Sequence, residues 1–457
     1  MNIGSIIKDT TNKEVVTPND LINIWLQYYK GDVDKFHHFN EYNGVKNIKR
    51  VRKTLNMPKK VSEDWANLLL NEKTDVVYGN DDQQQKLWDL LNSVNFWAKG
   101  NEGVEKTFAL GTGAFVENVD DDNRARFQFV TGNKIYPLSF DQDKITECAF
   151  VNVSSDRVII QFHLLDESKK YIIRTLVFKR NKNNTGDDIG ELVSDDTFET
   201  RGKLAWFQIL KPNIANNVDL NSPMGISIYA NALDVLQGVD LAYDGFCEEM
   251  RLGRSRIFVN KKLIQYDEQG ERPTFDNNES GFYYGGESEN AKPFEFYSPT
   301  LRTESYFNGI NNALNLLSSK VGFGENHYRF DNGGITTATQ VISENSEMFR
   351  SLKKHEIILN NVIIDACKTL MYIHNEFTQD GFKFDLDENI EVRFDDSIIE
   401  DKETMKMTDR QDVSMGTMSK LEYRMKWYNE DEDTARKKLA DIEEENKAQS
   451  MNFFSGE

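Results

Sequence analysis

The sequence has little proline, cysteine and histidine, and each shortage excludes a class of protein. Only 8 of its 457 residues are proline, so few helices are interrupted and long helices are allowed. The 3 cysteines, Cys148, Cys247 and Cys367, are too few for a disulfide framework and lack Cys-x-x-Cys spacing, which fits a reducing compartment. The 6 histidines form no His-Glu-x-x-His pattern. We therefore predict no metal site.

Long apolar runs and nucleotide-binding motifs are also missing. No segment approaches the roughly 18 apolar residues of a membrane span, and the first residues lack the core of a signal peptide. A Walker A motif and a Gly-x-Ser-x-Gly turn are absent, and Gly111-Thr112-Gly113 lacks the third glycine of a dinucleotide site. We expect no membrane partner, no cofactor and no enzymatic activity. An active site assembled from scattered residues stays open as an alternative.

The charge balance is strongly acidic. The 55 basic and 75 acidic residues give a net charge of −20 at pH 7, which disfavours a protein that grips nucleic-acid phosphates over its whole surface. A hydrophobic fraction of 39% and an aromatic fraction of 11% are typical of a folded chain with a sizeable core. Any contact with DNA is expected to be local or weak.

The pattern of apolar residues predicts a mixed α+β fold that begins with helices and continues with strands. Residues 17–110 have helical periodicity, with helix starts at Pro18 and Pro58. From Ala114 to about Leu210 the sequence changes to short β-branched and aromatic runs separated by turns. These runs predict a mostly antiparallel β region.

Two helices are predicted to bracket a small β insertion. The first starts at Ser222-Pro223, and a second runs from Thr303 to Val321, with turn-rich residues 265–300 between them. The first carries apolar residues at alternating spacings of three and four, which is typical of a helix-helix contact. This seam consists of Tyr229, Ala232, Leu236, Val239, Tyr243, Phe246 and Met250. We expect the two helices to pair in antiparallel fashion.

The longest predicted helix follows, and smaller helices end the chain. No glycine or proline occurs from Ile335 to Asp380, so one helix of about 40 residues, roughly 60 Å long, is expected. Its apolar stripe has a polar break at His355. Residues 395–457 are acidic, and Ser419 and Glu422 have the spacing of a capping box.

Two groups of basic residues stand out from the acidic background. The first contains no acid and consists of Lys46, Lys49, Arg50, Arg52, Lys53, Lys59 and Lys60. It indicates either an anion-binding face for DNA or an acidic partner, or a solvated helix face. The second lies where the seam helix ends and predicts a contact with nucleic acid or a partner protein; its members are Arg251, Arg254, Arg256, Lys261 and Lys262.

Acidic residues form a further pattern on the seam helix. Asp240, Asp244 and Glu248 recur every four residues on the face away from the seam. Like charges at that spacing cost roughly 0.2–0.5 kcal/mol per pair. Either solvent tolerates these charges, or the negative face has a function.

Several segments, in this order, resemble the portal proteins of long-tailed bacteriophages of Gram-positive hosts. The N-terminal motifs are Trp25-Leu26-Gln27-Tyr28-Tyr29-Lys30-Gly31 and Glu63-Asp64-Trp65-Ala66-Asn67-Leu68-Leu69. The later motifs are Asn221-Ser222-Pro223-Met224-Gly225-Ile226-Ser227 and Ile335-Thr336-Thr337-Ala338-Thr339-Gln340-Val341. Their shared order and spacing make the resemblance fairly specific, and it covers nearly the whole chain.

The resemblance implies a phage portal fold and a ring-shaped assembly. The implied parts are an α/β wing (1–222), stem helices (223–252 and 303–322), a β-containing clip (253–302), a tunnel loop (323–335), a long wing helix with adjoining wing (336–394) and a short α-helical crown (395–457). A ring of usually twelve subunits forms a head-tail connector at one capsid vertex of the virion after assembly in the host cytoplasm. Double-stranded DNA is packaged and ejected through it. The other implied partners are the terminase large subunit, a head-tail adaptor, and the major capsid and scaffold proteins.

In such a ring, two groups of residues are predicted to line the DNA channel. They are Asp240, Asp244 and Glu248 of the seam helix, and Asn326, His327, Tyr328, Arg329 and Phe330 of the loop. An acidic wall repels phosphates and lets the duplex slide. Alternatively, the loop is an ordinary connector whose rings pack on their own subunit. Two other functions stay open: a Mg²⁺-dependent DNA-processing enzyme, and a capsid scaffold protein without a channel.

Overall fold

The structure, a computed structural model, describes residues 3–16, 20–42, 44–142, 144–180, 189–260, 282–285, 294–330, 338–394, 402–428 and 430–442. The chain forms two compact units. The first comprises Met1–Gly333 and Arg350–Phe394, and the second comprises Gly334–Phe349 and Asp395–Glu457. Helices and sheets are mixed along the sequence, which confirms the predicted α+β class at that level.

Six helices and one hairpin occupy the described part of the first 110 residues. The helices are α1 (Ile3–Thr11), α2 (Asp20–Lys30), α3 (Asp34–His37), α4 (Met57–Leu69), α5 (Asp81–Ser93) and α6 (Phe96–Leu110). β1 (His38–Tyr42) and β2 (Asn47–Val51) pair in antiparallel fashion, so the purely helical interpretation of 17–110 is wrong here. The turn between them contains Gly44 with a φ of 90°, a conformation that favours glycine. Pro18 lies outside the described residues.

The antiparallel sheet predicted for 114–210 is confirmed as two sheets. The strands are β4 (Gly113–Val119), β5 (Ala125–Thr131), β6 (Ile135–Asp141), β7 (Lys144–Val153), β8 (Arg157–Leu165), β9 (Tyr171–Arg180), β10 (Ile189–Glu199) and β11 (Phe207–Leu210). Their orders are β10-β9-β8-β7-β6 and β11-β4-β5. Ile3, Ile6 and Ile7 of α1 pack on the larger sheet against residues such as Ile160 and Phe162, and this contact gives the sheet a covered apolar face.

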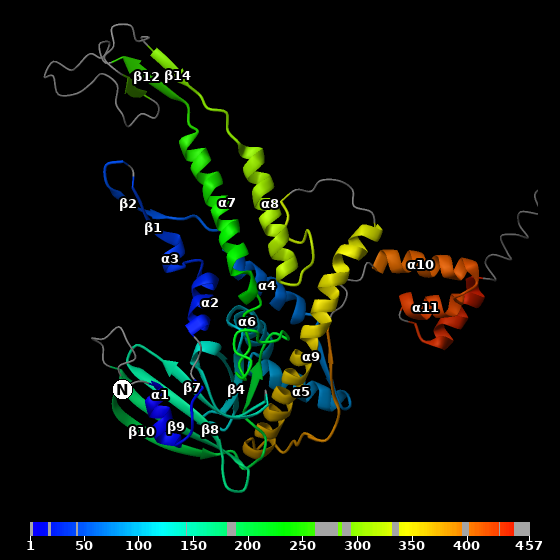
Figure 1. The fold of residues 1–457 in the computed structure, drawn as a ribbon. Coiled ribbons are helices and arrows are strands. Elements are labelled where there is room, and N and C mark those ends of the chain that lie inside the picture. Colours follow the sequence, from blue (N-terminus) through cyan, green and yellow to red (C-terminus); the bar gives the residue numbers. More distant parts are fainter. Residues whose placement is uncertain are drawn as a thin grey trace, which may run out of the picture. The chain divides into compact units, whose positions relative to one another are not determined.

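Helices α7 (Leu233–Leu252) and α8 (Thr303–Lys320) pack side by side and run in opposite directions, as predicted (Figure 1). The chain between them contributes β12 (Arg256–Asn260), β13 (Phe282–Gly285) and β14 (Phe294–Tyr297), in the sheet order β13-β12-β14. The predicted β insertion is therefore confirmed for these described strands. β3 (Asp75–Tyr78) and β15 (Ile390–Arg393) form a further antiparallel pair.

α7 begins at Leu233, after the short 3-10 turn Ala230–Ala232, rather than at Ser222 as predicted. The preceding segment is bound to other parts of the chain. The Gly225 N–H donates to Thr112 Oγ1 over 2.9 Å, and the Ile228 N–H donates to the Phe108 carbonyl over 2.9 Å. A Cβ atom on Gly225 would lie 2.3 Å from a backbone oxygen. A helix that began at Ser222 would need the Ile228 N–H for its own hydrogen bonds, so this contact favours a later start.

The long predicted helix is present as α9 (Ala338–Phe377), which has 40 residues. Its buried stripe includes Leu352, Leu359, Val362, Ala366, Leu370 and Ile373, as the periodicity predicts. In the second unit, α10 (Lys402–Met415) packs on α11 (Lys420–Tyr428). Glu422 N–H donates to Ser419 Oγ over 3.0 Å, and Ser419 N–H donates to Glu422 Oε2 over 2.9 Å, so the capping box is confirmed.

Candidate functional site

The acidic face of α7 is covered by the chain segment around the β1–β2 hairpin. Asp240 is buried, with 7% of its surface exposed. Its carboxylate accepts hydrogen bonds from Thr54 Oγ1 (2.9 Å) and from the Leu55 N–H (3.0 Å), and it lies 3.2 Å from His37 Nε2. Because His37 Nδ1 accepts a hydrogen bond from the Val33 N–H, the neutral ring carries its proton on Nε2 and donates it to Asp240.

The next acid on this face also has partners within the chain. Asp244 accepts a hydrogen bond from the Lys53 N–H over 2.9 Å and lies 3.9 Å from Arg52 Nε. The Arg52 guanidinium also lies over the rings of Phe36 and Phe39, at 4.3 and 4.8 Å. Part of the first basic group thus faces the acidic residues of α7 instead of forming a solvated helix face.

The three acids have different surroundings in the structure, and their assignment to a channel lining stays a prediction. Asp240 is buried against residues 37–55, and Asp244 is bound to the segment around Lys53. Glu248 is half-exposed and pairs with Arg251 on its own helix, with N–O distances down to 2.6 Å. This hydrogen-bonded ion pair lowers the pKa of the Glu248 carboxyl. The repeat of acids is tolerated because donors from a segment nearly 190 residues away compensate their charge.

The second basic group divides in the structure. Arg251 pairs with Glu248, and Arg256 is half-buried with a guanidinium nitrogen 3.2 Å from the Leu252 carbonyl. Arg254 is exposed, while Lys261 and Lys262 lie outside the described residues. A bidentate pair between Glu249 and Arg302 joins the end of α7 to the start of α8. The described members of this group are therefore an arginine in an intrahelical ion pair, a half-buried arginine and the exposed Arg254.

The loop after α8 is attached to α8 along its length. Asn311, Asn315 and Ser318 of that helix accept hydrogen bonds from the backbone N–H groups of Phe330, Asn326 and Tyr328, respectively. These acceptors lie at helical spacings of four and three residues, so they share one face of α8. They hold residues 326–330 close to the helix.

Aromatic contacts anchor the beginning of the same loop. Phe323 stacks on Trp65 with a centroid distance of 4.6 Å and on His327 at 4.2 Å. Tyr328 is buried, and its hydroxyl donates to Asp64 Oδ2 over 2.9 Å. Burial, together with the nearby Asp64 carboxylate, raises the pKa of Tyr328. Tyr328 thus packs on its own subunit, as the alternative of an ordinary connector expects, and its assignment to a channel lining stays a prediction.

The last two described residues of the loop are exposed. Arg329 is exposed, and Phe330 has 58% of its surface exposed although its ring lies 6.3 Å from that of Phe307. The loop therefore has an anchored base and an exposed end. Residues 331–335 of the predicted tunnel loop lie outside the described residues.

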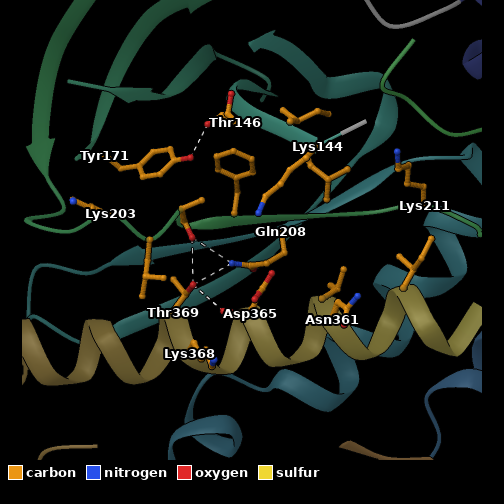
Figure 2. Close-up of a pocket in the computed structure, with 17 residues that line it drawn as sticks. Lys144, Thr146, Tyr171, Lys203, Gln208, Lys211, Asn361, Asp365, Lys368 and Thr369 are labelled. Carbon is orange, nitrogen blue, oxygen red and sulfur yellow. Dashed lines mark hydrogen bonds between the residues drawn. The ribbon is translucent and has the colours of Figure 1, made fainter. Parts of the chain in front are cut away.

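A pocket of about 500 Å³ that the sequence reasoning missed lies between β-strand residues and α9 (Figure 2). Its walls include Ile145, Phe207, Ile358 and Val362, and its rim carries Lys144, Lys203, Lys211 and Lys368. These residues come from segments more than 200 positions apart. Lys203 and Lys211 are close in sequence, but their spacing alone gives no signal of a pocket.

Beneath the pocket lies a buried carboxyl group. Glu117 of β4 has no exposed surface, and burial raises the pKa of its carboxyl to about 8, while a hydrogen bond with Gln208 opposes the shift. The Gln208 amide lies 3.2 Å from Thr369 Oγ1 and, with its nitrogen turned toward Glu117, 2.5 Å from Oε1. Glu117 is therefore largely protonated near neutral pH.

Metal-binding clusters and membrane-spanning helices are both absent from the described residues. Within the ranges given above, no three His, Cys, Asp or Glu side chains are grouped so that they could hold a metal ion. Across the same ranges, every helix is too short or too polar to cross a membrane.

A family model described as "Phage portal protein, SPP1 Gp6-like" matches residues 20–451. The chain belongs to this family of phage portal proteins. The match confirms the resemblance seen in the sequence motifs, and it gives the portal chain a role as a head-tail connector of a phage particle. The family is structural rather than enzymatic.

Solved structures of particle necks are similar to the portal chain at low identity. One, "Neck of native GTA particle computed with C12 symmetry", has 10% identity and a TM-score of 0.43, covering 92% of this chain and 97% of the other. The neck of an empty GTA particle computed with C6 symmetry has 11% identity and a TM-score of 0.42, covering 93% and 98%. A search of curated proteins found no match.

Proposed function

We propose that the portal chain assembles into a closed ring, of twelve copies by our expectation, at one vertex of a phage capsid. Double-stranded DNA enters and leaves the particle through the ring. The observation that carries the proposal is the family match over residues 20–451, which spans both units of the chain. Twelve copies at −20 each would carry about −240, a charge that suits a conduit from which DNA must be released.

The parts of the chain have proposed roles in this ring. The wing comprises 1–222 and 336–394, the stem comprises α7 and α8, the clip comprises 253–302, and the crown comprises 395–457. The antiparallel α7–α8 pair, with a small sheet at its far end, supports the stem and clip assignment. Because Ser227 and Ile228 donate hydrogen bonds to the Phe108 carbonyl of α6, and α7 begins at Leu233, we begin the stem helix at Leu233 rather than 223.

Within the predicted tunnel loop, Arg329 and Phe330 are the residues that we propose to face DNA or a neighbouring loop. Both are exposed, whereas Tyr328 and Asp240 are buried in their own subunit. The Arg329 guanidinium can bind a phosphate transiently. Arg329→Ala combined with Phe330→Ala should leave rings intact and reduce DNA packaged per particle. Lys320→Ala, which removes an exposed cation of α8, is the matched control.

The proposed partners, besides further copies of the chain and DNA, are a terminase large subunit, a head-tail adaptor, and the major capsid and scaffold proteins. Arg254, with Arg256, Lys261 and Lys262, is the proposed contact near the clip. We place the ring in the virion after assembly in the host cytoplasm. An Arg254→Glu variant should form rings and lose adaptor or terminase binding, because it reverses the charge of an exposed contact.

Electron microscopy of the purified full-length protein tests the proposed function directly. Rings with a central hole are the expected result. Solid oligomers without a hole would favour a capsid scaffold protein, and monomers that cleave DNA with Mg²⁺ would favour an enzyme. Either result would refute the conduit.

A further inference from the structure

The rim of the pocket in Figure 2 concentrates positive charge in an acidic chain. Lys144, Lys203, Lys211 and Lys368 surround it, and Asp365 is the acid on its α9 side. Among the residues that the structure describes, Lys144, Lys203 and Lys368 form no salt bridge with an acid. Four lysines around one cavity in a chain of net charge −20 form a local site for an anionic group.

The interior of the pocket restricts what can bind. Its walls combine apolar side chains, among them Phe207, Ile358 and Val362, with polar groups such as those of Gln208 and Thr369. A cavity of about 500 Å³ holds a few side chains and is too small for a DNA duplex. A polypeptide segment that presents apolar side chains beside carboxylates matches both the apolar walls and the lysines of this pocket.

The chain itself carries such a segment on strand β10. Leu192 and Val193 are 47% and 52% exposed, and Glu191 and Asp196 beside them are exposed as well. β10 is an edge strand of the five-stranded sheet. Glu191 makes only a loose, exposed ion pair with Lys179 at 4.0 Å, which is worth little. Exposed apolar residues on an edge strand favour a contact with another chain.

The two surfaces are complementary and lie on different elements of the first unit. β10 is at one edge of the sheet (Figure 1), whereas the pocket is lined on one side by α9 (Figure 2). A closed ring of more than two copies needs two different surfaces on each chain that fit each other. We propose that the pocket of one portal chain receives residues 191–196 of β10 from the neighbouring chain. This inference rests on the proposed ring. Leu192 and Val193 contact the apolar walls of the pocket, while Glu191 and Asp196 pair with the rim lysines.

Charge exchange tests this interface. Lys203→Glu with Lys368→Glu should raise the protein concentration needed for half-maximal ring formation roughly tenfold or more, because like charges would then meet. Glu191→Lys with Asp196→Lys should do the same, and the four changes together should restore assembly. Lys420→Glu with Lys437→Glu, the same charge change on exposed lysines of the second unit, should leave assembly unchanged. Mass photometry at physiological salt measures ring fraction, and circular dichroism verifies folding.

Cross-linking gives an independent measurement. With Cys247→Ser as background, Val193→Cys combined with Lys203→Cys should give a ladder of disulfide-linked oligomers upon oxidation, and neither single variant should. The inference would be overturned if the wild type formed rings with a central hole and neither assembly nor cross-linking responded to these changes. The proposed function would then still stand. Pocket variants that form normal rings but no longer bind another particle protein would overturn it too, since the occupant would then be that protein. Absence of wild-type rings would instead refute the proposed function.

Discussion

Asp240 and Glu117 are both buried carboxylic acids in the first unit, and their surroundings differ. Asp240 faces His37, Thr54 and the Leu55 N–H, three donors from a segment remote in sequence. Glu117 faces the Gln208 amide at the floor of the pocket, and burial raises its pKa. The comparison shows two ways to bury an acid: several donors stabilise the carboxylate, or a nearly apolar site keeps the acid protonated.

The comparison predicts its largest effect at Asp240. Asp240→Ala should lower the free energy of unfolding by about 3 kcal/mol, because the buried His37 and the half-buried Thr54 and Leu55 N–H lose their acceptor. Urea denaturation at pH 7 measures the change. Asp244→Ala is the control and should cost about 1 kcal/mol, since Asp244 is more exposed and accepts one backbone hydrogen bond. Equal losses for the two variants would contradict the assigned role of Asp240.

Glu117 gives the second prediction, in its dependence on pH. Its pKa is raised from 4.5 to about 8 in the folded chain, so the native state binds more protons than the unfolded state between these values. The group therefore costs up to about 1.4 kcal/mol of stability per pH unit as pH rises through this window. Glu117→Gln should remove this loss and be more stable than wild type at pH 9.

Glu147 is the control with the opposite sign. Although burial opposes ionisation, hydrogen bonds from Lys13, Ser139 and the Leu165 N–H lower the pKa of its carboxyl. The stability that it contributes is present above pH 4.5 and is lost as pH falls through the lowered pKa. Glu147→Gln should thus be destabilising at pH 7 and neutral in acid. Parallel pH profiles for the two variants would refute the distinction between the two kinds of site.

Tyr328 extends the comparison to a further carboxylate, that of Asp64 on α4. Tyr328→Phe keeps the ring against Phe323 and removes the hydrogen bond to Asp64. We expect a loss of about 1 kcal/mol in unfolding free energy. Phe330→Leu, at the exposed end of the same loop, should change stability little. A larger loss at Phe330 than at Tyr328 would reverse our assignment of the anchored base and the exposed end.

Local patterns predicted much of the fold. The period of three to four residues placed α8 and α9, and Ser419 and Glu422 marked the start of α11, because these signals depend only on neighbours in sequence. The sequence motifs that resemble those of phage portal proteins also indicated the family to which the chain belongs. The β1–β2 hairpin was missed because its short strands are rich in charged side chains, which obscure a period of two.

The candidate site was less predictable because its contacts join distant segments. The partners of Asp240 lie in residues 37–55, and the pocket joins Lys144, Lys203 and Lys368. In the sequence, the basic group near Lys53 and the acids of α7 form two separate patterns. Their opposite charges are the signal that could predict a contact between them. Pairing across nearly 190 residues depends on the tertiary fold, which periodicity does not encode.

His163 gives the smallest expected change and the sharpest contrast with His37. It is fully buried between Phe150 and Phe207, neither ring nitrogen has a hydrogen-bond partner, and burial lowers its pKa to about 3. Its contribution to stability therefore falls as pH drops from about 6.5 toward 3. At pH 7, His163→Leu should leave the free energy of unfolding unchanged or raise it by up to about 1 kcal/mol. At pH 5, the stability of the variant relative to wild type should be higher than at pH 7. Urea denaturation at both pH values measures this, and a clear loss at pH 5 would show that the imidazole has a partner.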